Sequence, residues 1–354
     1  MPITPLFGHQ EARTRLSAAI RSGSLPQVIL LTGPEGVGKQ RLGLWLAARL
    51  LCERGSEEPC GECGPCRRVG ELAHPDVHWL VPVPRPKAAE PDKQVEEVTE
   101  ALEAVMAERR QGGKWQAPDG MAIHGIASAR WLQRHAAMTA AEGSWRVFVI
   151  GRAERLVPQE SSTDAANALL KLLEEPPPRS VFVLTASEPG LVLPTIRSRA
   201  VPLRVMRLAD HDVAGFAAAA GLPRDDDAVR HAAGSIGRLL GRDDTARQKA
   251  AAAARAVREA VHEDAGARAL LALRQPVAQA RGEFTAMLDA LVDAYHGDLR
   301  AAAGHPGQQR KARRALRAIE LVLATREQAQ GNVNPRLALG ALAGDLAALE
   351  QGWH

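Results

Sequence analysis

Short apolar runs alternate with amphipathic stretches through the first two hundred residues of the chain. Consecutive apolar residues, many of them β-branched, are typical of strands buried on both faces of a parallel sheet. Such runs lie at 27–32, 77–83, 146–150, 180–185 and 200–205. Helical periodicity lies before the first run and between the later ones, at 9–22, 41–51, 127–141 and 161–175. The alternation predicts an α/β domain with a doubly wound, mostly parallel sheet.

Strand signals stop after about residue 207, and the rest of the chain has helical patterns only. We therefore expect an α/β domain over 1–207, a small helical domain over 208–245 and a larger helical domain over 250–354. The segment 84–120 is rich in Pro, Glu, Lys and Gly. It is predicted to be an exposed insertion with a charged helix near 93–110.

Composition narrows the class of protein only a little. The 354 residues are 45% hydrophobic and 24% charged, which is ordinary for a globular protein. The net charge of +4 permits contact with nucleic acid but does not require it. The first ten residues lack the pattern of a secretory signal, and no apolar run reaches the roughly 18 residues of a membrane span. We expect a cytosolic protein with reduced thiols.

The stretch GPEGVGKQ follows the first predicted strand and precedes a predicted helix. Its glycines and lysine fit a phosphate-binding loop, in which backbone N–H groups hold phosphates and the lysine reaches the outer ones. The pattern should end in Ser or Thr, whose hydroxyl binds Mg²⁺, but Gln40 stands there. The stretch predicts a degenerate nucleotide-binding loop, with ATP or ADP binding left open. A turn that binds nothing is the alternative. The candidate residues are Gly33, Gly36, Gly38, Lys39 and Gln40.

A metal-binding acid is also missing from the end of a later strand. The strand at 146–150 is followed by Gly151 and Arg152. Neither can hold Mg²⁺, and Arg152 would put a positive charge where the cation should lie. Glu154 is expected to be too far from the strand end. The loss of both Mg²⁺ supports predicts that this chain does not hydrolyse ATP itself.

All four cysteines lie within fifteen residues, spaced Cys-x7-Cys-x2-Cys-x2-Cys. Four thiolates at this spacing can surround Zn²⁺ tetrahedrally, with Gly61 and Gly64 in the turns between them. A complete set of four leaves no open position, so the site would be structural. Two disulfides or an iron–sulfur cluster are the alternatives. His74 and His78 lie nearby but are expected to be core or surface residues. The predicted zinc ligands are Cys52, Cys60, Cys63 and Cys66.

Several motifs together resemble a known family. LPQVILLTGPEGVGK, the cysteine cluster, HPDVHWL, NALLKLLEEPP and TIRSRA occur in the order seen in bacterial clamp-loader subunits of DNA polymerase III. GNVNPRLAL at 331–339 resembles a segment near the end of their third domain. These subunits are AAA+ proteins. The resemblance implies an AAA+ domain with a zinc module at 52–66, then a helical lid and a helical collar.

Two kinds of subunit share these motifs. The gamma/tau subunits hydrolyse ATP, whereas the delta-prime subunit has a degraded ATP site. Gln40, Gly151 and Arg152 make this chain resemble the delta-prime subunit. In the family a Thr after the fourth strand senses the γ-phosphate. Alignment places Ala186 at that position, or Thr185 if the register slips by one residue.

The resemblance also assigns roles to two arginines. The sequence Ser198–Arg199–Ala200 matches the Ser-Arg-Cys motif, whose arginine reaches the ATP site of the neighbouring subunit. A planar, permanently charged guanidinium suits γ-phosphate oxygens, so Arg199 is expected to act in trans. A surface ion pair, or Arg197 as the finger, are alternatives. Arg238 in GSIGR could contact a phosphate or brace two domains.

The basic run RKARRALR at 310–317 is expected to be a solvated helix face, with Leu316 and Ile319 turned inward. Direct DNA contact there is the less favoured interpretation. The resemblance implies instead that 250–354 is an assembly surface.

The function implied is that of a delta-prime subunit in the bacterial cytoplasm, without a membrane or a polymerase site of its own. It would join gamma/tau and delta subunits in a hetero-pentameric ring that loads the sliding clamp onto primed DNA. Alternatives are an ATP-hydrolysing gamma/tau-type subunit and a zinc-stabilised nucleic-acid-binding protein. ATP turnover by the isolated chain would support the first, and strong salt-sensitive DNA binding the second.

Overall fold

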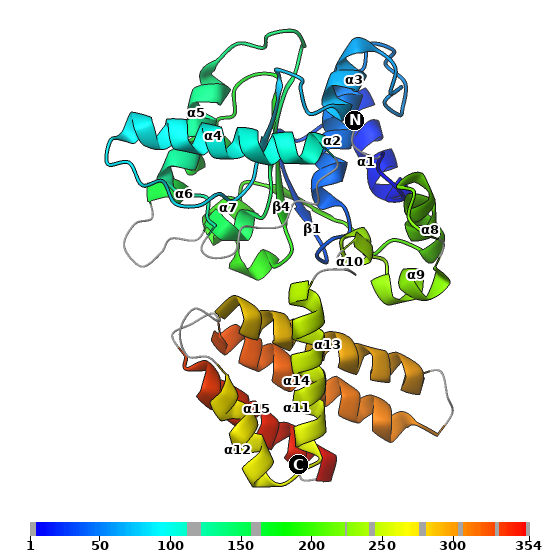
Figure 1. Cartoon of the computed structure of the whole chain (residues 1–354). Coiled ribbons are helices and arrows are strands. Elements are labelled where there is room, and N and C mark those ends of the chain that lie inside the picture. The colour runs from blue at the N-terminus through cyan, green and yellow to red at the C-terminus, as the bar shows by residue number, and fades with distance from the viewer. Residues whose placement is uncertain are drawn as a thin grey trace. The chain divides into compact units, whose positions relative to one another are not determined.

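The computed structural model describes residues 5–111, 122–156, 164–223, 225–240, 245–275, 281–303, 307–329 and 333–351. The chain divides into two compact units, Met1–Leu240 and Gly241–His354. The first contains a sheet with helices on both sides, and the described part of the second is helical (Figure 1).

Five parallel strands form one sheet in the first unit, in the order β2-β3-β4-β1-β5. The strands are β1 (Val28–Thr32), β2 (Val77–Leu80), β3 (Arg146–Ile150), β4 (Ser180–Ala186) and β5 (Val201–Arg204). Each predicted apolar run forms one of them. The predicted fold class, a parallel α/β sheet followed by helical segments, is confirmed.

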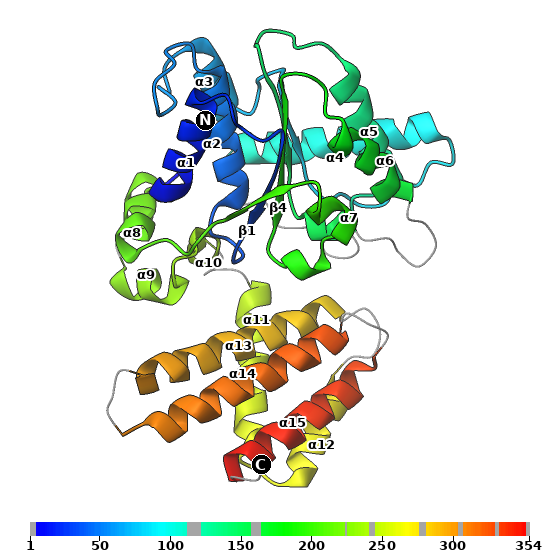
Figure 2. The ribbon, with the colours of Figure 1, turned by 180° about the vertical axis from the view of Figure 1, so that it is seen from behind.

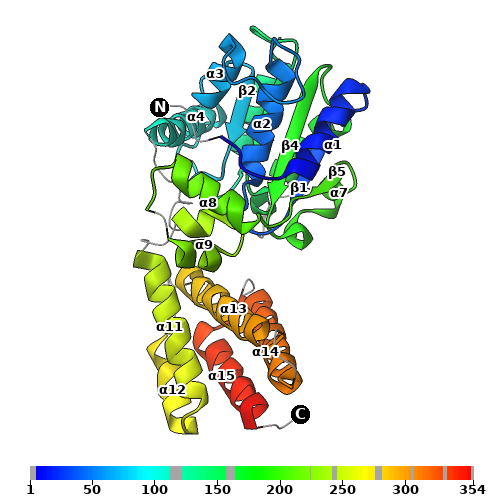
Figure 3. The same ribbon diagram turned by 90° about the vertical axis from the view of Figure 1, so that its right-hand side faces the viewer.

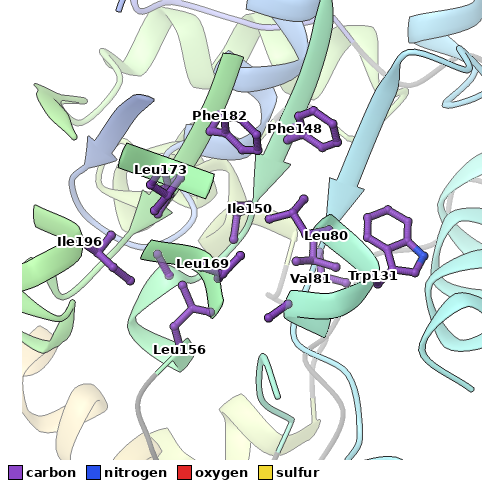
Figure 4. Packing of buried hydrophobic residues seen from close by; sticks show 14 of the residues in the cluster. Leu80, Val81, Trp131, Phe148, Ile150, Leu156, Leu169, Leu173, Phe182 and Ile196 are labelled. Carbon is purple, nitrogen blue, oxygen red and sulfur yellow. The ribbon is translucent and has the colours of Figure 1, made fainter. Parts of the chain in front are cut away.

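Helices cover both faces of this sheet because successive residues of a buried strand point to opposite sides. In β1, Ile29 and Leu31 join one hydrophobic cluster, and Val28 and Leu30 join the other. The first face is covered by α1 (Gln10–Arg21), α2 (Lys39–Leu51) and α3 (Gly64–Gly70). The second is covered by α5 (Ile126–Ala137), α6 (Asp164–Glu174) and α7 (Pro194–Arg197), as Figures 2 and 4 show.

The predicted insertion contains a long helix, α4 (Pro91–Arg110), whose apolar side is buried. Val95, Val98 and Leu102 belong to the same core cluster as α5. The segment begins and ends beside an antiparallel bridge between Val83 and Ile123. The expectation of an exposed insertion is therefore wrong for α4, because its valines and leucine recur at helical spacing and pack on the domain. Residues 112–121 lie outside the described part.

Helices follow the sheet, as predicted. The first unit ends with α8 (Asp210–Ala219), α9 (Asp226–Ala232) and α10 (Ile236–Leu240), around a small core that includes Val213 and Val229. The second contains α11 (Thr245–Val261), α12 (Ala265–Arg274), α13 (Arg281–Ala303), α14 (Gln309–Ala329) and α15 (Pro335–Gln351), which are labelled in Figure 3. The predicted boundaries 1–207, 208–245 and 250–354 stay a prediction.

The basic run lies on α14, and one of its two expected inward side chains is exposed. Ile319 is buried, but Leu316 is 50% exposed. Ala315 takes the inward position instead, one residue earlier on the helix. The predicted motif at 331–339 begins at residues outside the described part and continues into α15. Across the described residues, no helix has both the length and the apolar character needed to cross a membrane.

Candidate functional site

The glycine-rich loop joins β1 to α2, as the sequence predicts, and its three glycines have positive φ. The φ angles are 152° at Gly33, 73° at Gly36 and 104° at Gly38. A Cβ on Gly33 would lie 2.0 Å from the carbonyl oxygen of Val205, so only glycine fits there. The loop therefore keeps the backbone shape of a phosphate cradle.

The ammonium group of Lys39 is bound by the protein itself. Its Nζ donates to the carbonyl oxygens of Gly33 and Pro34, each at 2.7 Å, and to Oγ of Ser187 at 3.0 Å. Burial lowers the pKa of Lys39 to about 8, and the nearby carboxylates partly oppose this shift. An ammonium has three donors, and all three have acceptors here. The group that would grip a phosphate is thus satisfied without one.

Glu154 lies nearer to the loop than the sequence indicates. Its Oε1 accepts from the backbone N–H of Ser187 at 3.3 Å, and its Oε2 is buried without a hydrogen-bond partner. Burial raises the pKa of Glu154, while hydrogen bonds and the charges of Arg152 and Lys39 lower it. A short 3-10 helix, Ala153–Leu156, begins shortly after the end of β3 and brings the carboxylate back towards the loop. Spacing along the sequence did not reveal this reversal.

The side chain of Gln40 fills the space beside Gly151. A Cβ added to Gly151 would lie 2.6 Å from Nε2 of Gln40 and 2.7 Å from its Oε1. The same Oε1 accepts from Nε1 of Trp79 at 2.8 Å. The guanidinium of Arg109 lies over the ring of the same indole, 3.5 Å from its centroid. Positions 40 and 151, which both depart from the nucleotide-site pattern, therefore pack against each other. Trp79 of β2 fixes the amide of Gln40, and Arg109 of α4 covers the indole of Trp79.

Arg152 points its charge across the loop. Its guanidinium forms an ion pair with Glu35, and its backbone N–H donates to Oγ1 of Thr185 at 3.1 Å. Thr185 is buried and contacts the carbonyl oxygen of Ile150, so its hydroxyl serves the strand ends. Ala186 has no polar atom to offer. Neither candidate for a phosphate-sensing residue is free to sense one, and the hydroxyl that does reach Lys39 belongs to Ser187.

The segment GSIGR packs directly on the loop. The backbone N–H of Gly237 donates to the carbonyl oxygen of Gly36 at 2.9 Å, and Oγ of Ser235 donates to that of Glu35 at 3.0 Å. A Cβ on Gly36 would lie 2.4 Å from Oγ of Ser235. Arg238 donates its backbone N–H to the same Oγ at 3.2 Å. Ser235 and Gly237 thus brace the loop, and the role of the Arg238 side chain stays a prediction.

A buried histidine next to Gly151 gives the fold a pH dependence. Nε2 of His124 lies 2.7 Å from the carbonyl oxygen of Gly151, and burial lowers the pKa of His124 to about 4. The unfolded chain takes up this proton near pH 6.5. Stability from the neutral ring is therefore complete above pH 6.5 and is lost as the pH falls towards 4. Urea unfolding of His124→Gln, which keeps a donor, should lose about 2 kcal/mol less than the normal chain between pH 7.5 and 5. Equal losses would contradict this assignment.

The four cysteines meet at the end of α2 and the start of α3. Their sulfurs all lie within 4.8 Å of one another, and those of Cys60 and Cys66 are 3.9 Å apart. Tetrahedral Zn²⁺ with Zn–S bonds of about 2.3 Å separates its sulfurs by about 3.8 Å, so the donor set fits zinc. All four are free cysteines. Gly61 has φ of 74°, as a tight turn requires, whereas Gly64 begins α3.

The thiols of Cys60 and Cys66 differ in environment, and their pKa values shift in opposite directions. The backbone N–H groups of Cys63 and Glu62 lower the pKa of Cys60 to about 6, and burial raises the pKa of Cys66. His74 and His78 do not join the sulfurs. His74 is buried and accepts from the backbone N–H of Asp76, and His78 stacks on a phenylalanine of β3. His74 is a core residue, and His78 is partly buried.

The loop between the first two cysteines is attached to α1 and α2. The carbonyl oxygen of Glu57 accepts from Oγ of Ser17 at 2.8 Å and from Nε of Arg49 at 3.1 Å. The carboxylate of Glu58 accepts from Nε1 of Trp45 at 2.8 Å and forms an ion pair with Arg13. The cysteine module therefore fastens the two helices that flank the nucleotide loop.

Arg199 is bound within its own chain. Its Nε donates to Oε1 of Glu174 at 2.8 Å, Nη2 forms an ion pair with the same oxygen, and Nη1 donates to the carbonyl oxygen of Thr195 at 2.7 Å. Arg197 is exposed. The isolated chain thus shows the surface ion pair that was one of the sequence-based alternatives.

Arg199 and the nucleotide loop lie at opposite ends of the parallel strands. The loop follows Thr32 at the carboxyl end of β1, and Arg199 precedes Val201 at the amino end of β5. Thr32 pairs with Arg204 in the parallel register. The length of β5 alone separates these two ends by about 10 Å. Arg199 and its own loop therefore lie at opposite ends of the parallel strands.

The order of the five parallel strands, with a glycine-rich loop between β1 and α2, defines a P-loop α/β protein of the AAA+ class. A family model described as "DNA polymerase III, delta subunit" matches residues 8–209. The chain therefore belongs to this family of clamp-loader subunits of DNA polymerase III.

Relatives of both kinds are similar to the chain. DNA polymerase III subunit delta' of Pseudomonas aeruginosa is 32% identical over 49% of this chain and 40% of the relative. Subunit delta' of Bacillus subtilis is 28% identical over 51% of this chain and 42% of the relative. Subunit gamma/tau of Mycobacterium tuberculosis is 28% identical over 57% of this chain and 29% of the relative. The matches span less than half the length of these relatives.

Proposed function

We propose that this chain is a delta-prime subunit of the bacterial clamp loader, which assists ATP hydrolysis in a neighbouring subunit and performs none itself. Its partners would be gamma/tau and delta subunits in a hetero-pentameric ring, the sliding clamp and, through the complex, primed DNA. Family membership supports the complex. The filled nucleotide site supports the delta-prime role within it, in the bacterial cytoplasm.

The observation that carries this proposal is the packing of Gln40 on Gly151. A working site needs a hydroxyl and a carboxylate here to hold Mg²⁺. The amide of Gln40 occupies the space that a side chain at 151 would need, and Trp79 holds it there. Protein atoms also satisfy the ammonium of Lys39. The loop has become a structural element of the domain.

The four cysteines would hold one structural Zn²⁺, which supplies a cross-link and no catalysis because all four positions are taken. The loop that carries Glu57 and Glu58 depends on this cross-link for its attachment to α1 and α2. Zinc would thus support the helix α2 that begins at the nucleotide loop.

Reconstitution tests the proposed function. The chain is mixed with gamma/tau and delta subunits from the same source, and assembly is followed by gel filtration. Clamp loading onto primed DNA is then measured with and without this chain. We expect loading to require the chain even though its own loop is inactive. A chain that neither joins the complex nor changes loading would contradict the proposal.

The packed pair predicts a reversal by double substitution. Gly151→Asp introduces a side chain against Gln40, displaces its amide and breaks the bond to Trp79, which should lower the free energy of unfolding by about 1–3 kcal/mol. Gln40→Thr removes the obstructing amide, so the double variant should recover most of that loss. Urea unfolding of both single variants and the double variant measures the coupling. Purely additive losses would show that 40 and 151 do not share one space.

An ATP-hydrolysing gamma/tau-type subunit is the second candidate, because gamma/tau relatives match the chain as well. Two described acids lie near Lys39, Glu35 and Glu154, and the buried carboxylate of Glu154 is the one that we consider able to support such activity. It predicts turnover by the isolated chain that depends on Mg²⁺.

A further inference from the structure

The guanidinium of Arg199 is occupied along the edge that would bind a phosphate. Nε and Nη2 form the fork that takes carboxylates and phosphates in a bidentate manner, and both donate to Oε1 of Glu174. Nη1 is engaged by the carbonyl oxygen of Thr195 and, at 3.4 Å, by Oγ of Ser198. A phosphate can reach this fork only where Glu174 leaves it.

The backbones that carry the two side chains are fixed. Glu174 is the last residue of α6, and Arg199 follows α7 by two residues. Leu169 and Leu173 of α6 and Ile196 of α7 are buried in one core cluster, and Figure 4 shows them close together. The side chains of Arg199 and Glu174 remain 31% and 46% exposed. Rotation of side chains is therefore enough to part them.

The position of Glu174 is not explained by the stability of its helix. A carboxylate at the carboxyl end of a helix meets the negative end of the helix dipole, which is unfavourable. Arg199 offsets this charge. The adjacent Glu175 is also exposed, and its carboxylate has no hydrogen bond or ion pair among the described contacts.

We propose that Glu174 is a positioning residue that holds Arg199 in the resting subunit and competes with the neighbouring nucleotide for it. The inference rests on the proposed finger role of Arg199. Glu174 and a γ-phosphate are both anions that require the same fork, so one excludes the other. The contact keeps the finger withdrawn until a phosphate of the adjoining subunit replaces the carboxylate.

Glu174→Gln in the assembled complex tests this competition. The amide keeps the size of the side chain but removes the charge that retains Arg199. An exposed ion pair of this kind is weak, so ATP turnover without clamp or DNA should rise about two- to fivefold. The KM for ATP should fall, because the freed guanidinium can already contact the bound nucleotide. Glu175→Gln is the matched control and should change neither quantity.

Double substitution separates positioning from a merely structural role. In the Arg199→Ala background, Glu174→Gln should have no further effect, because the competition acts only through the guanidinium. A change in turnover that persists without Arg199 would overturn the proposal, as would unchanged turnover and KM in the single variant while Arg199→Ala lowers turnover. If Arg199→Ala itself has no effect, the finger role fails instead. Gel filtration and melting confirm equal assembly, and Glu174→Asp, with a shorter reach, provides a second variant expected to raise turnover.

Discussion

Arg199→Ala should abolish ATP hydrolysis in the gamma/tau site that faces this chain, although this chain is proposed to hydrolyse no ATP itself. An arginine finger stabilises the charge that develops on the transferred phosphoryl group and contributes about 10³–10⁵-fold to turnover. Arg199 and its own loop lie at opposite ends of the parallel strands, so we expect its removal to act on the site of another subunit. Loss of the exposed ion pair with Glu174 should cost the fold little.

The measurement is clamp- and DNA-stimulated ATP hydrolysis by the reconstituted complex, under single-turnover conditions. We expect the slow fraction to correspond to one site in each complex. Arg197→Ala is the matched control, since Arg197 is exposed, lies two residues away and has no side-chain hydrogen bond or ion pair among the described contacts. Full activity with Arg199→Ala in correctly assembled complex, or a loss with Arg197→Ala instead, would remove the role from Arg199.

Removal of zinc should have the second largest effect, on the stability of the first unit. Free thiols cannot hold the loop that carries Glu57 and Glu58, so its contacts with α1 and α2 should loosen together. We expect one zinc for each chain by elemental analysis. Chelation should lower the free energy of unfolding by several kcal/mol, about 3–5, which is less than the whole binding energy because the sheet stays folded.

The Cys60→Ser/Cys63→Ser variant provides the control for this experiment. It should contain no zinc, should have the lowered stability from the start and should not respond to the chelator. A metal-free normal chain with unchanged melting would contradict the zinc assignment. Iron in the purified chain would favour the iron–sulfur alternative.

The strands and the order of the motifs could be predicted because they depend on local patterns. Consecutive apolar residues identify strands buried on both faces. Cysteines separated by two residues are close in sequence, so their sulfurs are also expected to be close in space. Contacts across the fold could not be predicted in this way. Gln40 and Gly151 are far apart in the sequence, so each is predicted as a separate loss of an Mg²⁺ ligand. The structure shows that the Gln40 side chain fills the space beside Gly151.

The remaining differences also come from tertiary packing. Segment 84–120 has the composition of a loop, but Val95, Val98 and Leu102 bury one side of α4. Leu316 is exposed because a shift of one residue on α14 lets Ala315 face the core. Glu154 approaches Lys39 only through the turn after β3. The helical spacing of the apolar residues in α4 was a usable signal, but the placements of Leu316 and Glu154 do not follow from composition or spacing.

ATP hydrolysis by the purified, isolated chain in the presence of Mg²⁺ tests the central claim most directly. Lys39→Ala serves as the reference for contaminating activity, because a working loop depends on this lysine. We expect the normal chain to show no turnover above that of the variant. Turnover that requires Mg²⁺ and disappears with Lys39→Ala would show an active nucleotide site in this chain and would contradict the account.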